Sequence, residues 1–471
     1  MPAWLENFLP ILLLLAVVAV VLARLPKVEI DHSDAFRKRR FFNWFPLGLT
    51  YAFLYMGRYN LTVAKSAFAE LGMMTNADFG EIFMFGAVTY GCAFVINGPI
   101  CDRLGGRFTI LLGAAGSAIA NFAMGMVVYT GFTSDAETLK TTYTLLYAFN
   151  MYFQSFGAVS IVKVNAAWFH VRERGVLGGI FGILISLGVY FAFDWNSMIL
   201  KAVHTPETPG VHWVFFTPAA ILCIFFLLDF FLIRDRPAGA GFDNFDLGDA
   251  TSGESEEPDP VLSVFKRMFT SKIILTIAAI EFCSGFLRNA IMHWGKIFSK
   301  QTGVADQFVF QNWGLMLCCA GIFAGMFAGV ISDHVFNSRR GPVAAILYGG
   351  MVAGALLMFV ILDSVLLGWT VVFMSLCIIG VHGMLSGTAS ADFGGRKNAG
   401  IAVGVIDGFV YLGTGLQSGI LGKLLPDGDA ARDPANWIAW PGAMLPLAVI
   451  GLIFALLIWN AKPQSKSASA H

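Results

Sequence analysis

Two arginines lie near the middle of long apolar stretches, and each half of the chain contains one of them. Arg58 occurs in FPLGLTYAFLYMGRYNLTVA, and Arg288 occurs in IILTIAAIEFCSGFLRNAIMHWGKIF. A guanidinium stays protonated at physiological pH, and placing it at bilayer depth costs at least ~2.5 kcal/mol, so such a residue usually serves a function. Because the planar guanidinium matches the oxygens of a phosphate group, the two arginines indicate an anion-binding site.

The composition indicates a protein that crosses a membrane many times. Of the 471 residues, 56% are hydrophobic and only 13% are charged, which is too little charge for a soluble globular protein. The sequence has no alternation with a period of two, so we predict helices rather than the strands of a barrel. About thirteen stretches are long enough to span a bilayer, at roughly 8–25, 44–67, 81–101, 108–131, 143–168, 175–195, 213–233, 272–298, 310–331, 342–362, 367–389, 399–422 and 438–460.

The distribution of charge predicts the orientation of these helices. The net charge is zero, so no overall field favours nucleic acid. Basic residues are expected to face the cytoplasm, and they gather in alternate connections, at 37–40, 102–107, 171–175, 234–237, 265–267, 338–341 and 395–397. We therefore expect a bacterial-type inner membrane protein in which the helical core begins and ends in the cytoplasm.

The first apolar run is predicted to be an extra transmembrane helix with its amino end outside. Glu6 precedes this run, Arg24 and Lys27 follow it, and it has neither a basic leader nor a small-residue cleavage site. Residues 1–41 would then comprise this helix and a basic cytoplasmic connector.

The remaining helices divide into two sets of six, which resemble each other. Residues 235–270, rich in Gly, Pro, Ser and acidic residues, are predicted to be a solvated cytoplasmic linker. We expect one six-helix bundle over 42–234, another over 271–461 and a cytoplasmic tail over 462–471. The distance along the chain is 44 residues from Arg58 to Asp102 and 45 from Arg288 to Asp333, and each aspartate opens a basic loop. Such a duplication, with a charge in each copy, is typical of carriers that work by alternating access.

Several motifs resemble those of a known family of carriers. The pattern G-x-x-x-D-R-x-G-G-R at residues 98–107 is similar to the cytoplasmic loop signature of the major facilitator superfamily. More specific are Tyr51-x-x-x-Tyr55-x-x-Arg58-x-Asn60 and FLRNAIMHW, which are accompanied by WFHVRERG and SDHVFNSRRG. Over roughly residues 42–460 the chain resembles the organophosphate:phosphate antiporters, which exchange glycerol 3-phosphate or hexose 6-phosphate for inorganic phosphate.

The resemblance implies both a fold and a binding site. The fold would be that of an all-α membrane protein with the major facilitator architecture, in which two six-helix bundles have pseudo-two-fold symmetry and the extra amino-terminal helix is added. In the site, Arg58 and Arg288 would bind phosphate from opposite bundles, and Tyr51, Tyr55 and Tyr90 would line the same cavity. Spacings of four and three residues independently place Tyr51, Tyr55 and Arg58 on one face of a helix.

Three positions depart from the pattern of the glycerol 3-phosphate carriers. A lysine that commonly follows the first arginine is Tyr59 here, a second-helix lysine aligns with Phe94, and a fifth-helix histidine aligns with Ile185 or Ser186. Lys163 is a candidate to restore one cation, although its place near the cytoplasmic end also suits a side chain that reaches the membrane surface. The resemblance therefore predicts phosphate recognition and leaves the organic group open.

Other ionisable residues have different predicted roles. Asp407 and His293 are the two groups that could carry a proton, and His293 is also a candidate for the substrate site; for Asp407 the alternative is a structural hydrogen bond with a neighbouring hydroxyl. The residues expected to latch the cytoplasmic loops are Asp102, Arg103, Arg107, Asp333 and Arg340. The sequence contains no motif for a nucleotide, a metal or a catalytic triad, so we predict no cofactor, no metal and no enzymatic activity.

The sequence thus predicts a secondary transporter that exchanges an organophosphate for inorganic phosphate by alternating access. Its partners would be a small phosphorylated anion, inorganic phosphate and the lipid bilayer, without nucleic acid, and we expect a monomer. Two alternatives remain open. One is a transporter-like sensor of sugar phosphate that acts with a membrane kinase, and the other is a proton-coupled symporter of an organic anion that uses Asp407 or His293.

Overall fold

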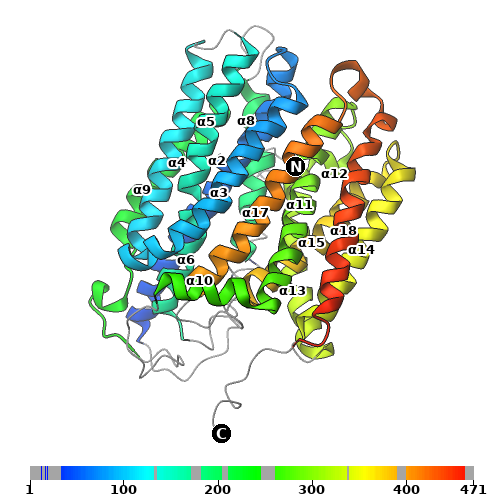
Figure 1. The fold of residues 1–471 in the computed structure, drawn as a ribbon. Helices are drawn as coiled ribbons and strands as arrows, with labels where there is room; N and C mark the ends of the chain where they lie inside the picture. Colours follow the sequence, from blue (N-terminus) through cyan, green and yellow to red (C-terminus); the bar gives the residue numbers. More distant parts are fainter. Residues whose placement is uncertain are drawn as a thin grey trace. The chain divides into compact units, whose positions relative to one another are not determined.

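The structure is a computed structural model that describes residues 33–131, 135–170, 182–203, 210–245, 260–336, 339–389 and 399–461, together with residues 12, 16 and 19. Within these ranges every regular element is a helix (Figure 1). Nine of the described helical segments are long and apolar enough to cross a membrane, as expected for a multi-pass membrane protein. The predicted first helix and the basic segments 171–175 and 395–397 fall outside the described residues, apart from isolated positions of the first helix.

The order of the helices follows the predicted spans closely. The first half contains α2 (Asp34–Glu70), α3 (Asn76–Leu104), α4 (Gly106–Tyr129), α5 (Ala136–Gln154), α6 (Phe156–Trp168), the π-helix η1 (Phe191–Trp195), α8 (Asn196–Val203) and α9 (Trp213–Leu232). The second half contains α10 (Val261–Thr270), α11 (Lys272–Gln301), α12 (Phe308–Gln311), α13 (Trp313–Val335), α14 (Arg340–Ile361), α15 (Leu366–His382), the π-helix η3 (Gly383–Ala389), α17 (Ala399–Leu424) and α18 (Ala439–Leu457).

Polar side chains mark where several of these helices begin. Ser33 accepts a hydrogen bond from the backbone amide of Phe36 at 3.2 Å and starts α2. Asp135 accepts from the amide of Thr138 at 2.8 Å and starts α5. This backbone hydrogen bond favours the charged carboxylate and lowers the pKa of Asp135. Such caps satisfy amides that have no partner within the helix.

Helix α10 was not expected, because residues 235–270 were predicted to be a solvated linker. Its residues VLSVFKRMFT place apolar side chains on one face, and Met268 packs with Ile274, Ile401 and Val405. The partly buried Phe265 packs against this cluster. The amphipathic spacing therefore gives the end of the linker an apolar face that it can bury.

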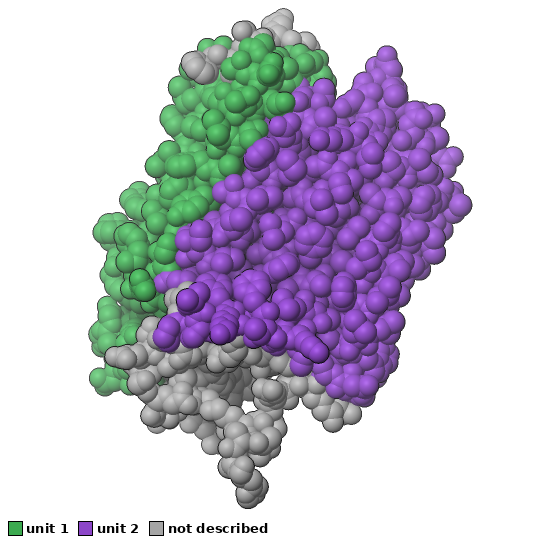
Figure 2. All heavy atoms as spheres, in the orientation of Figure 1, with its two compact units in different colours: residues 1–73, 100–254, 312–322 green, residues 74–99, 255–311, 323–471 purple. Residues whose placement is uncertain are grey.

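The described chain forms two compact units, and each unit takes a segment from the other half of the sequence. Unit 1 comprises Met1–Met73, Ile100–Glu254 and Asn312–Ile322, and unit 2 comprises Met74–Pro99, Ser255–Gln311 and Phe323–His471 (Figure 2). Most of α3 therefore belongs to unit 2, and the first part of α13 belongs to unit 1. The division of the sequence into bundles over 42–234 and 271–461 stays a prediction.

Glycines allow α3 to approach α17 closely within unit 2. A Cβ atom on Gly80 would lie 2.4 Å from the backbone oxygen of Ser418, and one on Gly91 would lie 2.9 Å from the backbone oxygen of Gly408. Close backbone contact is typical of membrane helices, because the hydrophobic effect does not hold helices together in lipid and small residues allow tight van der Waals packing instead. Beside Gly91, the rings of Tyr90 and Tyr411 lie 3.9 Å apart between centroids.

Asp194 of η1 holds the start of α13 within unit 1. Its carboxylate accepts hydrogen bonds from the backbone amides of Gly314 at 2.8 Å and Leu315 at 2.9 Å. We expect Asp194→Ala to destabilise the protein by about 2–3 kcal/mol, because two amides at a helix start would lose a charged acceptor. Thermal unfolding of the purified protein measures this change. Asp429→Ala is the control, because the Asp429 side chain is 91% exposed, and equal effects of the two substitutions would contradict the capping role.

Candidate substrate-binding site

Arg58 lies fully buried in α2, and polar groups of unit 1 fix its position. Its side chain is 0% exposed. Its Nε donates a hydrogen bond to Oε1 of Gln154 at 2.9 Å, and its Cζ lies 4.5 Å from the centroid of the Tyr55 ring. The hydroxyl of Tyr147 donates to the backbone oxygen of Arg58 at 2.9 Å. The guanidinium is therefore held inside the protein rather than directed into lipid.

Tyrosines lie along α2 on both sides of Arg58, and the rings of Tyr55 and Tyr59 lie next to its guanidinium. The rings of Tyr51 and Tyr55 lie 5.4 Å apart in an edge-to-face arrangement, and the ring of Tyr59 lies 5.7 Å from that of Tyr55. Tyr59, at the position of the lysine in the resembling carriers, is buried and stacks on Phe193. These rings give Arg58 an aromatic surrounding that favours a cation.

A network of asparagines supports the backbone next to Arg58. The side-chain amides of Asn121 and Asn150 donate to the backbone oxygen of Gly57 at 3.2 Å and 2.9 Å. Asn60 donates to Oδ1 of Asn121 at 2.7 Å. Because buried hydrogen-bond networks fix one geometry, the position of α2 around Arg58 is well determined within unit 1.

Arg288 is the corresponding residue of unit 2. It lies in α11 and is 8% exposed. The next residue, Asn289, donates to Oγ1 of Thr414 at 2.8 Å, which ties this part of α11 to α17. Both predicted arginines are therefore buried within protein, each in its own unit.

His293 faces a different side of α11 from Arg288. Five residues separate them, which corresponds to about 140° around a helix. The imidazole is 1% exposed, its Nε2 lies 3.1 Å from Oδ1 of Asn289, and its ring centroid lies 4.4 Å from that of Phe83. The amide of Asn289 is oriented by its bond to Thr414, so its oxygen faces Nε2 of the imidazole. His293 is therefore packed against Asn289 and Phe83 within unit 2.

Asp407 lies on α17 and accepts a hydrogen bond from the hydroxyl of Ser386 in η3. A second intramembrane carboxylate, Glu281 of α11, lies in the same unit and has an ionic contact of 2.8 Å with Nδ1 of His382. The sequence predicted a hydroxyl partner as the alternative for Asp407, and it gave no indication of the pair formed by Glu281 and His382.

Two buried lysines were also missed by the sequence analysis. Lys65 is 1% exposed and lies seven residues after Arg58, and Lys296 is 7% exposed and lies eight residues after Arg288. Each lysine lies five residues before the end of its helix, at Glu70 and Gln301 respectively. Seven residues return to about the same side of a helix, whereas eight residues end about a quarter of a turn away, and both correspond to about 11–12 Å along the axis. For Lys65 the signal was present in the sequence, as a lysine in helical phase with Arg58.

Tyr90 and Lys163 have other neighbours in the structure. Tyr90 is 0% exposed and packs on Phe94 and Tyr411 in unit 2. Lys163 donates to Oδ1 of Asp102 at 2.8 Å in unit 1, and its side chain is 41% exposed. This contact favours a lysine that reaches the end of its helix over one in the substrate site.

The loop between α3 and α4 is fixed against the end of α9 and Asp235. Gly105 has φ +88°, in the left-handed region that favours glycine, and a Cβ there would lie 2.8 Å from Oδ2 of Asp235. The backbone amide of Arg107 donates to Oδ1 of Asp235 at 2.8 Å, and its guanidinium donates to the backbone oxygen of Phe230 at 2.6 Å. Asp235, which follows α9, is therefore fixed against this loop, while Arg103 is exposed beside it.

The second predicted loop is described only in part. Nη1 of Arg340 donates to Oγ of Ser332 at 3.0 Å in unit 2. The backbone of Asp333 lies in α13, and its side chain is outside the described part of the structure. The role of these residues as a cytoplasmic latch stays a prediction.

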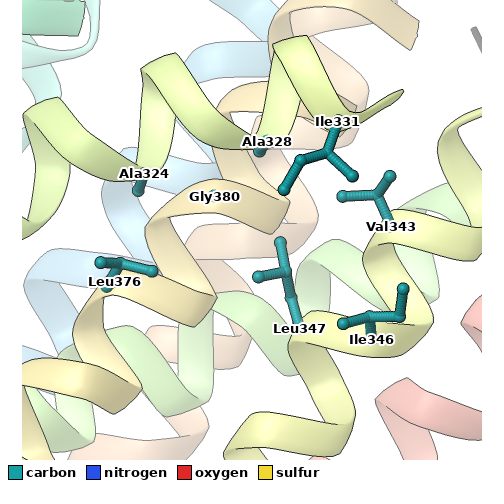
Figure 3. Close-up of a pocket in the computed structure, with 8 residues that line it drawn as sticks. All are labelled: Ala324, Ala328, Ile331, Val343, Ile346, Leu347, Leu376 and Gly380. Carbon is teal, nitrogen blue, oxygen red and sulfur yellow. The ribbon is translucent and has the colours of Figure 1, made fainter. Parts of the chain in front are cut away.

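A cavity of about 190 Å³ in unit 2 does not have the chemistry of a phosphate site (Figure 3). It is lined by apolar side chains and one glycine, from α13, α14 and α15: Ala324, Ala328, Ile331, Val343, Ile346, Leu347, Leu376 and Gly380. Because an anion needs cations or hydrogen-bond donors, the arginines remain the candidates for substrate binding.

Comparison with known proteins supports the predicted fold. Residues 47–418 match the sequence profile of the Major Facilitator Superfamily. The chain is 24% identical over 452 residues to the membrane sensor protein UhpC of Salmonella typhimurium, covering 92% of this chain and 93% of that protein. It is also 24% identical over 465 residues to the glycerol-3-phosphate transporter of Bacillus subtilis, covering 92% and 96% respectively.

Among solved structures, the fold is similar to a bacterial homolog of the human lysosomal transporter Spinster in an inward-facing and unoccupied conformation. The TM-score is 0.65 at 14% sequence identity, and the match covers 91% of this chain and 96% of that chain. The predicted major facilitator fold is thereby confirmed, and the extra amino-terminal helix stays a prediction.

Proposed function

Because the chain belongs to the Major Facilitator Superfamily, we propose that it is a secondary transporter that exchanges an organophosphate for inorganic phosphate by alternating access. The observation that carries this proposal is the buried Arg58, whose guanidinium is oriented by Gln154 and Tyr55 inside a helix of unit 1. The buried Arg288 supplies the equivalent cation in unit 2. A chain of this family is a transport protein rather than an enzyme.

In this proposal both arginines are ligands of the phosphate group. A guanidinium keeps its charge at any working pH and donates paired hydrogen bonds to phosphate oxygens. Enclosing two permanent cations without an anion is costly, so only the loaded carrier passes readily through the occluded state. Obligatory exchange follows, and the two concentration gradients set its direction.

The class of substrate follows from the motifs and from the names of the relatives. The tyrosine and arginine motif resembles that of the organophosphate:phosphate antiporters, and one relative is named as a glycerol-3-phosphate transporter. We therefore propose glycerol 3-phosphate or a sugar phosphate as the organic substrate. Lys65, buried in helical phase with Arg58, and the buried Lys296 add cationic positions for an anion of this kind.

We propose that the protein lies in a bacterial-type inner membrane and acts as a monomer, with its helical core beginning and ending in the cytoplasm. This orientation rests on the basic connections, which lie on alternate loops of the sequence. The predicted extra helix would place the amino terminus of the chain on the outer side of this membrane.

A second candidate function is a sensor of sugar phosphate that acts with a membrane kinase. The observation that favours it is the similarity to a relative named as a membrane sensor protein, which extends over 92% of this chain. A sensor needs the same phosphate ligands as a carrier, so the arginines alone do not separate the two functions.

Counterflow into proteoliposomes separates the candidates. Vesicles loaded with inorganic phosphate are expected to accumulate labelled phosphate, and external glycerol 3-phosphate or glucose 6-phosphate should compete with it. Vesicles without internal phosphate should show little uptake, because the empty carrier does not reorient. Binding without any counterflow would identify a sensor. Uptake driven by a proton gradient without internal anion would identify a symporter.

A further inference from the structure

Unit 2 contains a cluster of ionisable side chains that phosphate binding alone does not explain. Glu281 of α11 is 0% exposed, and its Oε2 lies 2.8 Å from Nδ1 of His382 at the end of α15. The other oxygen, Oε1, is buried and has no hydrogen-bond partner among the described residues. Enclosing a carboxylate with one bare oxygen is costly, so this position is unusual for a residue that serves only packing.

A second carboxylate belongs to the same cluster. Asp407 of α17 accepts from Ser386 in η3, and α11 packs closely against both α15 and α17. Asp407 interacts electrostatically with Glu281, His382 and Arg288. Two acids, one imidazole and one permanent cation therefore share one electrostatic environment.

Among the residues that the structure describes, two further ionisable side chains lie next to Glu281. From α14, Tyr348 donates its hydroxyl to the backbone oxygen of Ile280 at 2.6 Å, next to Glu281. Cys283 lies two residues further along α11 and interacts electrostatically with Glu281. The sequence of α18, which also packs on α11, contains no ionisable residue. The cluster itself thus consists of Glu281, His382 and Asp407.

The cluster lies close enough to Arg288 to respond to an anion bound there. Glu281 precedes Arg288 by seven residues, which places both on one side of α11 at a separation of about 10 Å along the axis. At that distance and an effective dielectric of about 20, one unit of charge changes a proton equilibrium by roughly tenfold. An anion at Arg288 offsets the arginine charge and so favours the protonated forms of the acids and of His382.

We propose that Glu281, His382 and Asp407 form a proton-binding site that takes up a proton when phosphate binds at Arg288. The inference rests on the proposed function, because it requires an anion at Arg288. The proton comes from the water on the side where the substrate enters, and it is released with the substrate on the other side. His382 is the entry point, since its side chain is 23% exposed whereas Glu281 is 0% exposed. The carrier then moves phosphate together with a proton of its own.

Titration calorimetry with inorganic phosphate tests this site. The purified full chain is titrated near pH 7 in buffers of different ionisation enthalpy, and the slope gives the number of protons taken up per phosphate bound. Protonation of the phosphate itself contributes the same number of protons in every variant. The difference in proton uptake between variants therefore measures the protons taken up by the protein. We expect Glu281→Gln to bind phosphate with lower proton uptake than the wild type, by on the order of half a proton.

Asp229→Asn is the matched control. Asp229 is also a buried intramembrane carboxylate, which accepts from Oγ1 of Thr50 at 2.7 Å in unit 1, and it lies outside the cluster. The substitution Asp229→Asn should leave the number of protons taken up per phosphate at the wild-type value. Because Glu281→Gln can fail to fold, His382→Gln is measured as well, with the same expected loss. If neither variant folds, the wild type is titrated with sulfate, whose charge is constant near neutral pH.

Two results would overturn the inference. One is proton uptake in a folded Glu281→Gln or His382→Gln protein equal to that of the wild type. The other is the absence of proton uptake when the wild type is titrated with sulfate. If the wild type shows phosphate counterflow, either result rejects the proton site and leaves the proposed exchange intact. If the wild type shows no phosphate counterflow, the proposed exchange itself is rejected.

Discussion

Replacing Arg58 by lysine should reduce phosphate exchange at least about a hundredfold, even though the positive charge is retained. The ammonium group of lysine lacks the planar fork that binds two phosphate oxygens, and it cannot reproduce the bond from Nε to Gln154. Disrupting a buried, hydrogen-bonded charge contact costs about 2–5 kcal/mol, and 2.7 kcal/mol already corresponds to a hundredfold loss. Counterflow of labelled phosphate into proteoliposomes measures the effect.

Arg39→Lys on the same helix is the matched control for this substitution. Arg39 donates to the backbone oxygen of Leu232 at 2.6 Å near the beginning of α2, away from the tyrosines around Arg58. Exchange by this variant should stay within a few-fold of the wild type, because any lost hydrogen bond affects stability rather than phosphate binding. Full exchange by Arg58→Lys, at wild-type protein levels, would show that Arg58 is not a phosphate ligand.

Local periodicity was sufficient to predict the helices and the grouping of side chains along one of them. The stretch around Arg58 is long enough to span a bilayer, and spacings of four and three residues place Tyr51 next to Tyr55 and Tyr55 next to Arg58 in α2. These relations depend only on helical geometry, which one segment of sequence contains. The same reasoning applied to Lys65 would have found it, since it lies seven residues after Arg58.

Contacts between distant segments could not be predicted in this way. Gln154 reaches Arg58 across 96 residues of sequence, and His382 reaches Glu281 across 101. Which helices become neighbours depends on packing over the whole unit, and a single sequence does not show it. The two compact units illustrate the point, because each one includes a segment of the other half of the chain.

The substitution Gly285→Ala should destabilise the protein by on the order of 2–4 kcal/mol through the packing of α11 on α17. A Cβ on Gly285 would lie 1.8 Å from the backbone oxygen of Val410, so the two helices would have to separate. A reciprocal contact occurs at Gly413, where a Cβ would lie 2.0 Å from the backbone oxygen of Phe282. Separation would also weaken the hydrogen bond that Asn289 donates to Thr414, next to Arg288.

Thermal unfolding in detergent compares Gly285→Ala with Gly349→Ala, the same substitution on α14 of unit 2. A Cβ on Gly349 would meet no described atom within 4 Å, so this control should be neutral or slightly stabilising, since alanine favours a helix by about 0.5–1 kcal/mol over glycine. A backbone oxygen cannot rotate away as a side chain can. The clash between the new Cβ at Gly285 and the oxygen of Val410 can therefore be relieved only if α11 or α17 moves. We therefore expect Gly285→Ala also to lose phosphate affinity at Arg288, which lies one turn further along α11. Unchanged stability in Gly285→Ala would mean that α11 and α17 pack less closely than these contacts require.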